Sequence, residues 1–206
     1  MDTFDIKKAR SALYSGKVGE FTLLDVPEQA YLMVDGHGNP GTAVAYQQAL
    51  EALYSVSYTI RFAAKKALGR VHVVGPLEGL WWADDMDAFT ARAKDDWDWT
   101  MMIYQPEWIS PDLVSESIAA AGKKKALPAL DRLRFETLTE GLSVQTLHVG
   151  SYDDEGPVLK RMHHEYMPEH NLTFTGKHHE IYLSDPRKVE AAKLKTILRQ
   201  PVVAAP

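Results

Sequence analysis

The side chains best suited to chemistry are a glutamate and a tyrosine close together near the end of the chain. Residues 180–183 read Glu-Ile-Tyr-Leu, an alternation that predicts a strand with one polar and one apolar face. Glu180 and Tyr182 would then point the same way. We expect Ile181 and Leu183 to face the helices and Glu180 to face a ligand cleft, where it could attract a cation or deprotonate a water molecule. The alternative is a solvated charge on an edge strand.

Tryptophan is concentrated in and beside the predicted strands in the middle of the chain. Flat indole rings stack on planar or cationic ligands, so this cluster favours an aromatic binding pocket. The alternative for any single ring is a packing role in the core. The residues concerned are Trp81, Trp82, Trp97, Trp99 and Trp108.

A strong strand is predicted over residues 97–104. Alternation places Thr100, Met102 and Tyr104 on one face, and the tryptophans on the other. The sequence leaves open which of these two faces lines a pocket.

The histidines cluster in the last quarter of the chain without the spacing of a metal site. The segment from His164 to His170 lacks the H-E-x-x-H spacing that puts two imidazoles on one helical face. We also expect Pro168 to break the helix between them. The sequence therefore predicts no metal and no cofactor, and histidines that are solvated or hydrogen-bonded. The others in this cluster are His163, His178 and His179.

A glycine-rich turn at residues 36–41 matches G-x-G-x-x-G, but it is a poor dinucleotide site. Pro40 removes a backbone donor where a phosphate would need one, and Asp35 puts a negative charge beside it. We interpret the segment as a turn.

Bulk composition excludes several classes of protein. The chain has 206 residues, a formal net charge of -5 and no cysteine, so it has neither a disulfide framework nor a thiolate site. It lacks the basic excess typical of nucleic-acid binding and any apolar run of membrane-spanning length. We expect a cytoplasmic protein that binds neither nucleic acid nor membrane.

The elements that must position these residues indicate an α+β fold with an internal duplication. Val34 ends a strand and Gly41 opens a helix, and Val149 and Gly156 stand at the same spacing. We predict a single domain over residues 1–206, made of two strand–helix–strand–strand modules (about 21–104 and 132–198) with antiparallel sheets and a central ligand cleft. The predicted strands are 29–34, 71–74, 80–82, 97–104, 143–149 and 180–183, and the predicted helices are 42–67, a short one over 86–93, one opening at Ser110-Pro111, and 157–166.

Several segments resemble the GyrI-like small-molecule-binding proteins over about residues 20–200. They are Trp82, Trp97–Thr100, Val149–Pro157, and the C-terminal stretches His178–Arg187 and Lys193–Pro201. The resemblance implies the same duplicated fold. It also implies one of three roles, because the family includes ligand-sensing domains of transcription regulators, a gyrase inhibitor, and stand-alone hydrolases of cyclopropane-bearing DNA-alkylating natural products.

The resemblance also assigns site residues. The family's pocket glutamate corresponds to Glu180, and the tyrosine and tryptophans of the hydrolase branch correspond to Tyr104, Trp82 and Trp99. We therefore expect Glu180 and Tyr104 to be catalytic. The expected ligand-binding residues are Trp81, Trp82, Trp99, Met102, Trp108 and Tyr182.

Three functions remain open at this level. The first is a cofactor-free hydrolase of electrophilic, cyclopropane-bearing aromatic toxins. The second is a non-catalytic binder or sensor of hydrophobic or cationic drugs, and the roughly 20 residues before the first strands are too few for a helix-turn-helix DNA reader. The third is a gyrase-modulating protein, which no feature of the sequence favours. The expected partner is a small hydrophobic or cationic aromatic ligand, and the oligomeric state is open.

Overall fold

The computed structural model describes residues 3–83 and 94–206, which form two compact units. The first unit contains residues up to Ala9, Gln29–Leu77 and the described part of Trp82–Leu138. The second contains Arg10–Glu28, Glu78–Trp81 and Thr139–Pro206. The short helix predicted over 86–93 lies outside the described residues.

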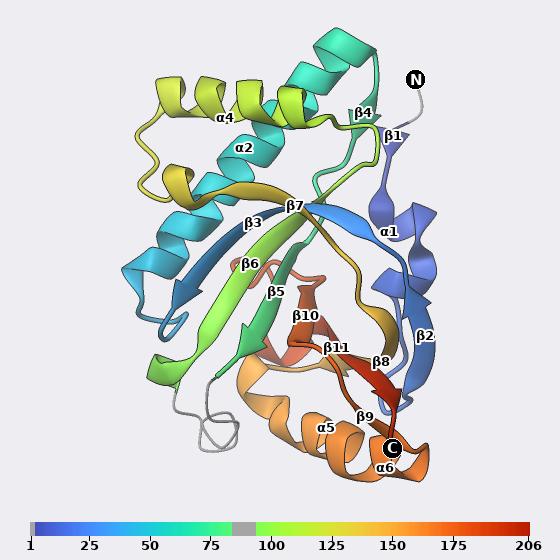
Figure 1. Cartoon of the computed structure of the whole chain (residues 1–206). Helices are drawn as coiled ribbons and strands as arrows, with labels where there is room; N and C mark the ends of the chain where they lie inside the picture. Colours follow the sequence, from blue (N-terminus) through green and yellow to red (C-terminus); the bar gives the residue numbers. More distant parts are fainter. Residues whose placement is uncertain (1–2, 84–93) are drawn as a thin grey trace. The chain divides into compact units, whose positions relative to one another are not determined.

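The first unit is a sheet with helices on one face. Strand β3 (Gln29–His37) pairs antiparallel with β6 (Asp98–Gln105) on one side and with β7 (Arg134–Leu138) on the other. Helix α2 (Val44–Leu68) packs on β3 and β6, and α4 (Pro111–Lys124) packs on α2 (Figure 1). Smaller elements are β1 (Thr3–Phe4), which pairs parallel with β4 (Val71–His72), helix α1 (Ile6–Ala9), and the 3-10 turns η2 (Lys94–Asp96) and η3 (Leu130–Arg132).

Local sequence signals explain both long helices of this unit. Helix α2 has apolar side chains at helical spacing, and they are buried against the sheet. It ends at Gly69, whose φ of 63° is left-handed and suits glycine. Helix α4 begins at Pro111, and the Ser110 hydroxyl accepts a hydrogen bond from the Leu113 amide at 3.2 Å. Both predicted helices are confirmed.

Trp99 fixes how α2 meets the sheet. Its ring is fully buried and meets the Tyr46 ring of α2 edge-on, with centroids 5.2 Å apart. Its indole nitrogen donates to the Gly38 carbonyl at 3.1 Å. A Cβ atom at position 36 would lie 2.1 Å from the Trp99 ring, so Gly36 is needed for close packing.

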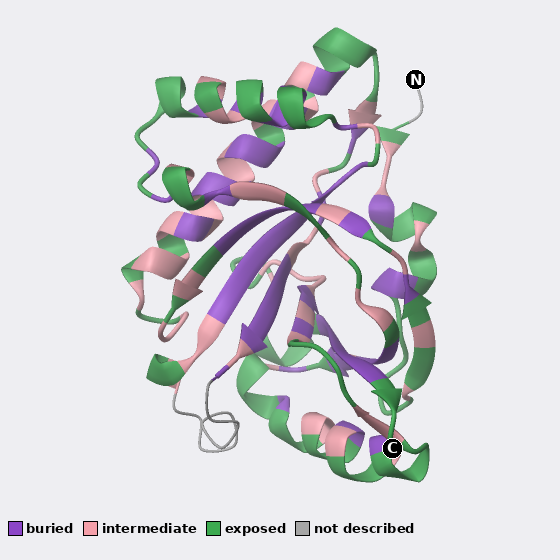
Figure 2. Cartoon of the chain, viewed as in Figure 1, coloured by how far each residue is buried: buried purple, intermediate pink, exposed green. Residues whose placement is uncertain are grey.

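The second unit contains a sheet in the order β2 (Thr22–Val26), β8 (Gly141–Val149), β11 (Lys195–Ala204), β10 (His178–Tyr182) and the Glu78–Trp81 part of β5 (Leu77–Trp82). Strand β9 (Leu172–Phe174) pairs with the end of β11. The central strands are buried over most of their length (Figure 2). The 3-10 turn η1 (Ser11–Tyr14) also belongs to this unit, as does η6 (Ala191–Lys193).

One helical segment covers a face of this sheet. It runs from the turn η4 (Tyr152–Asp154) through α5 (Gly156–Arg161) and a π-helical turn η5 (Met162–Tyr166) to α6 (Met167–Glu169). Met162 and Met167 pack on Val144 of β8 and Leu198 of β11. The expectation that Pro168 breaks this helix is wrong. A wider π-helical turn directly precedes Pro168. This fits proline, which has no backbone N–H to donate the next helical hydrogen bond.

The predicted duplication is confirmed. One module runs β3, α2, β5 and β6, and the other runs β8, the α5–α6 segment, β10 and β11. The class is α+β with antiparallel pairing in both modules. No helix in residues 3–83 or 94–206 is long and apolar enough to cross a membrane.

Candidate functional site

Glu180 is held by a chain of hydrogen bonds that starts at a tryptophan. The Trp81 indole nitrogen donates to the Tyr182 hydroxyl at 2.9 Å. That hydroxyl donates to Glu180 Oε2 at 2.7 Å. The prediction that Glu180 and Tyr182 share a face is confirmed. Because the Tyr182 hydroxyl accepts from Trp81, its own proton points to Glu180 Oε2 and orients the Glu180 side chain.

The expectation about which face meets the helices is wrong. Glu180 pairs with Leu198 of β11, whose side chain lies in the core beneath α5 and α6. Ile181 pairs with Ile197 on the opposite face. Strand alternation separates the two sets of side chains but does not say which set the helices cover. Glu180 therefore lies on the helix-covered face of the second unit.

A second carboxyl group, Glu155, completes the site from the start of α5. Its residue is only 5% exposed, and the Glu155 Oε1 atom is buried without a hydrogen-bond partner among the described residues. Burial, followed by the negative charge of Glu180, raises the pKa of Glu155 well above its usual range. Glu155 therefore keeps its proton to a higher pH than an ordinary glutamate does.

Aromatic rings and a histidine surround this pair. The Tyr152 ring meets the Tyr182 ring edge-on, with centroids 5.5 Å apart. His178 Nε2 lies 3.5 Å from Glu180 Oε1. Within the described residues, no lysine or arginine forms an ion pair with Glu155 or Glu180. The Glu180 side chain is 14% exposed and Tyr152 is 39% exposed, so the cluster reaches the surface at these two residues.

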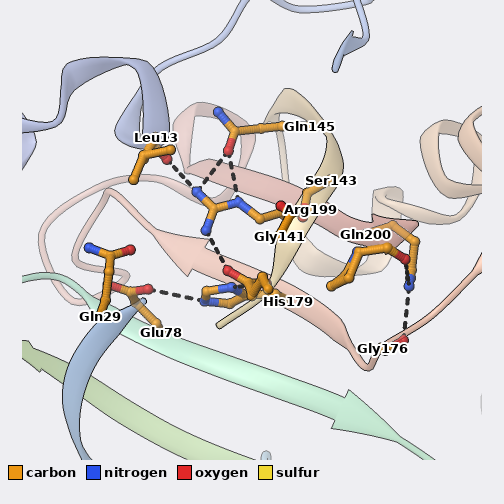
Figure 3. A network of polar contacts seen from close by, with 12 residues as sticks. Leu13, Gln29, Glu78, Gly141, Ser143, Gln145, Gly176, His179, Arg199 and Gln200 are labelled. Carbon is orange, nitrogen blue, oxygen red and sulfur yellow. Dashed lines mark hydrogen bonds and ion pairs between the residues drawn. The ribbon is translucent and has the colours of Figure 1, made fainter. Parts of the chain in front are cut away.

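The opposite face of β10 carries a closed ionic network, drawn in Figure 3. His179 Nε2 lies 3.0 Å from Glu78 Oε2, and His179 Nδ1 lies 2.9 Å from Glu140 Oε1. Arg199 Nη1 lies 2.8 Å from Glu140 Oε2. The guanidinium group also donates to the Gln145 side chain at 2.9 and 2.8 Å and to the Leu13 carbonyl at 2.6 Å.

Each basic side chain in this network lies beside an acidic one. Burial alone would lower the pKa of His179, but the Glu140 charge and the hydrogen bonds to Glu140 and Glu78 outweigh burial and raise it. Burial would raise the pKa of Glu140, but His179 and Arg199 together lower it to about 2. The raised pKa of His179 and the lowered pKa of Glu140 both favour the charged forms of this pair. The Tyr14 hydroxyl also donates to Glu78 Oε1 at 3.0 Å, so the network ties η1 to the sheet.

The remaining predicted site residues lie in the first unit or point elsewhere. Trp99 faces α2, whereas Met102 and Tyr104 lie on the other face of β6. Tyr104 is buried beside the rings of Phe4 and Tyr31. These placements put Trp99 and Tyr104 on opposite faces of one sheet.

Trp108 and Trp82 have different surroundings. Trp108 packs between the Arg70 guanidinium, 4.6 Å from its ring centroid, and the His72 ring. Trp82 is half-buried, and strand alternation points it away from the side chain of its neighbour Trp81. The proposed ligand-binding roles of Trp82, Met102 and Trp108 stay predictions.

Sequence reasoning missed Glu155 and Tyr152. Both lie in Val149–Pro157, a stretch that carries the family resemblance, but Glu155 ends a short acidic run that looks like an ordinary solvated surface. A usable signal was its place directly before Gly156-Pro157, where a helix begins. Among the described residues, no group of three or more histidines and carboxylates is placed to hold a metal ion.

Comparisons with known proteins agree with this architecture. An uncharacterised conserved protein from Listeria innocua is 38% identical, with a TM-score of 0.89 over 98% of this chain and 100% of that one. A hydrolase from Listeria innocua is 37% identical, with a TM-score of 0.85 over 98% and 100% of the two chains. The C-terminal domain of EcmrR, 12% identical with a TM-score of 0.58 over 90% of this chain and 98% of that one, shares the fold alone.

No curated protein matches the sequence. The family model described as the GyrI-like small molecule binding domain matches residues 19–203, which is most of the chain. The protein therefore belongs to the GyrI-like small-molecule-binding family.

Proposed function

We propose that this protein is a cofactor-free hydrolase of electrophilic, cyclopropane-bearing aromatic compounds, with a protective role against such toxins. The observation that carries the proposal is the Glu180 carboxylate, oriented by Tyr182 and Trp81 and left without a lysine or arginine partner among the described residues. The similarity to a Listeria innocua hydrolase supports it.

In the proposed reaction, Glu180 orients a water molecule and accepts one of its protons. The water oxygen attacks the strained cyclopropane carbon, and the ring carbon–carbon bond breaks. Its electron pair moves into the conjugated carbonyl group, which becomes an enolate or phenolate oxygen and takes up a proton. A positioned general base contributes about 10²–10⁴ to the rate. Tyr104 remains the predicted donor to the carbonyl oxygen, and Trp82 the predicted stacking ring.

The non-catalytic alternative is binding of hydrophobic or cationic drugs. It is favoured by the same cluster, because a carboxylate beside indole and phenol rings attracts organic cations. In that case Glu180→Gln would weaken binding of cations and leave neutral ligands unaffected.

Turnover of a carbonyl-conjugated spirocyclopropane distinguishes these functions. We expect wild-type protein to open the ring, and Glu180→Gln to lower kcat by about 10²–10⁴ with little change in KM. Glu169→Gln, an exposed carboxyl group at the end of α6, is the matched control and should behave like wild type. A wild-type protein that binds the compound without turnover would reject the hydrolase.

Two further variants test the residues of the first unit. Trp82→Ala should weaken ligand binding by about 1–3 kcal/mol, the scale of an aromatic hot spot. Tyr104→Phe should slow turnover by removing a donor to the developing negative charge. If both variants bind and react like wild type, the ligand does not contact these side chains.

A further inference from the structure

His178 lies beside the Glu180 carboxyl group, and the proposed reaction leaves it without a role. Strand alternation puts residues 178, 180 and 182 on the same face of β10. The His178 Nε2 atom lies 3.5 Å from Glu180 Oε1, and the His178 side chain is 9% exposed. Both of its ring nitrogens are buried without a hydrogen-bond partner among the described residues. Polar nitrogens buried in this way are costly and uncommon, which marks His178 as a candidate for function.

The two oxygens of the Glu180 side chain have different neighbours. Oε2 accepts the Tyr182 hydroxyl proton at 2.7 Å, whereas Oε1 faces His178 Nε2. A proton that Glu180 takes from water is therefore better placed on Oε1. An approach of about half an ångström would bring His178 Nε2 and Oε1 to the distance of an ordinary hydrogen bond.

Glu180 must lose this proton before it can activate another water molecule. The other side chains bonded to it in sequence, Tyr182 and Trp81, form a chain of donors that points toward Glu180. An indole N–H donates only, so this chain cannot take a proton away from the carboxyl group. An imidazole can, because histidine gains and loses a proton near neutral pH.

We propose that His178 takes the proton from Glu180 after each turnover and passes it to the solvent. The inference rests on the proposed function, because it concerns the proton that Glu180 removes from water. His178 acts through Glu180 and does not contact the substrate, so it is a relay and not a catalytic residue.

The proton transfers balance over one cycle. Water gives a proton to Glu180 Oε1 as its oxygen bonds to the cyclopropane carbon and the ring bond breaks. That proton then moves to His178 Nε2, which leaves a carboxylate beside an imidazolium. The imidazolium releases the proton to the solvent, and the enolate or phenolate oxygen of the product takes one from the solvent. No net proton is gained or lost.

His163 lies next to His178 but does not accept this proton. Its ring centroid lies 6.4 Å from that of His178 and 4.9 Å from that of Phe174. Burial, and then the charges of His178 and His164, lower the pKa of His163 to about 3. His163 is therefore neutral near neutral pH, and the proton stays on His178 until the solvent takes it.

A comparison of the first turnover with later ones tests the relay. Wild-type protein and His178→Gln are each mixed with the carbonyl-conjugated spirocyclopropane at low buffer concentration, with protein in excess and then with substrate in excess. Glutamine can still donate to Glu180 but cannot carry a proton. We expect His178→Gln to keep the wild-type rate in the first turnover and to lower kcat by about 10²-fold. Because the relay follows ring opening, kcat/KM should not change.

Added imidazole distinguishes a lost relay from slow product release. It should raise the kcat of His178→Gln and of His178→Ala, because it accepts the proton in place of the missing ring, and it should leave the first turnover unchanged. His164→Gln, which changes an exposed histidine in η5, is the matched control and should have wild-type rates with and without imidazole. Circular dichroism verifies the fold of each variant, and His178→Ala provides the test if His178→Gln does not fold.

The outcomes separate this inference from the proposed function. A fast first turnover followed by slow turnover that imidazole relieves supports the relay. Wild-type kcat in the His178 variants overturns it and leaves the proposed function standing, and so does a slow kcat that imidazole does not relieve. Equal loss of first and later turnovers, or loss of the folded state in both variants, would assign His178 to the orientation of Glu180 or to the fold and overturns the relay. Wild-type protein that does not open the ring overturns both proposals.

Discussion

His179 and Glu180 are neighbours on β10, but they point to opposite faces of the strand and into different electrostatic surroundings. His179 joins two carboxylates and Arg199 in a network where each charge has a partner (Figure 3). The negative charge of Glu180 helps to raise the pKa of the buried Glu155, and His178 Nε2 lies 3.5 Å from Glu180 Oε1.

This difference between the two faces of β10 distinguishes ionic groups that stabilise the fold from groups that could take part in catalysis. Charges removed from water are tolerated when each is paired and hydrogen-bonded, as on the His179 face. On the Glu180 face, burial and then the negative charge of Glu180 raise the pKa of Glu155. Groups with shifted pKa values are common at functional sites, because their protons can be exchanged with a ligand.

The largest expected effect comes from breaking the matched network. Arg199→Met removes the cation but leaves Glu140 buried beside His179 alone. Removing one member of a buried ion pair costs about 3–5 kcal/mol. Urea denaturation should show a loss of unfolding free energy on this scale, whereas Arg187→Met, on an exposed ion pair, should leave it unchanged. A loss below about 1 kcal/mol would show that the network is weak.

The raised pKa of Glu155 should make the free energy of unfolding depend on pH, and Glu155→Gln should remove this dependence. Because the folded-state pKa of Glu155 is raised above its reference of 4.5, the folded protein retains a proton that the unfolded chain releases. Wild-type stability therefore falls as pH rises from that reference toward the raised pKa, by up to about 1.4 kcal/mol per pH unit.

Glu155→Gln has no such proton. Its free energy of unfolding, relative to that of wild type, should therefore increase over the range from about pH 5 to about pH 8. Denaturation at several pH values measures the difference. The groups facing Glu155 are Glu180 on β10 and Asp153 in η4, and both remain in the variant. A difference that does not change with pH would mean that Glu155 is ionised in the folded protein.

A smaller effect is expected where the hydrogen-bond chain to Glu180 begins. Trp81→Phe keeps an aromatic ring but removes the donor to the Tyr182 hydroxyl. Loss of one such hydrogen bond costs about 0.5–1.5 kcal/mol. The Tyr182 hydroxyl would be less firmly oriented, so turnover should fall modestly while the fold is kept. Full activity in Trp81→Phe would show that the Tyr182–Glu180 bond needs no support.

The smallest effect on stability is expected from Glu180→Gln, in contrast to Arg199→Met. The change removes one of two repelling carboxyl groups, so unfolding free energy should stay within about 0.5 kcal/mol of wild type or rise. Thermal denaturation tests this prediction. A large loss of stability in Glu180→Gln would indicate that Glu180 serves the fold, and the comparison between the two faces would fail.

Local patterns predicted the elements that depend on local interactions. Helix α2 follows from apolar spacing and ends at Gly69, and α4 begins at Ser110-Pro111, because caps and periodicity act within one or two turns. Strand β11 was not predicted as a strand. It contains Arg199, Gln200 and Pro201 in the middle of a buried sheet. Arginine and glutamine side chains are mostly exposed in proteins, and proline is rare in a central strand.

Long-range partners explain why β11 is nevertheless a strand. Arg199 is neutralised by Glu140 and hydrogen-bonded to Gln145, which is 54 residues away in sequence. The Gln200 side chain donates to the Gly176 carbonyl at 3.0 Å. These contacts satisfy polar groups that would otherwise be costly to bury, and no window of neighbouring residues contains them.

The sequence by itself determined the duplicated α+β architecture, and it put Glu180 and Tyr182 on one face of a strand, because strand alternation is a property of the backbone. Only the tertiary structure decided that this face is the one under α5 and that Glu155 joins Glu180 there. It also decided that Trp99 packs against α2. Which face is covered, and which acid is buried beside which, depends on contacts between residues far apart in the chain.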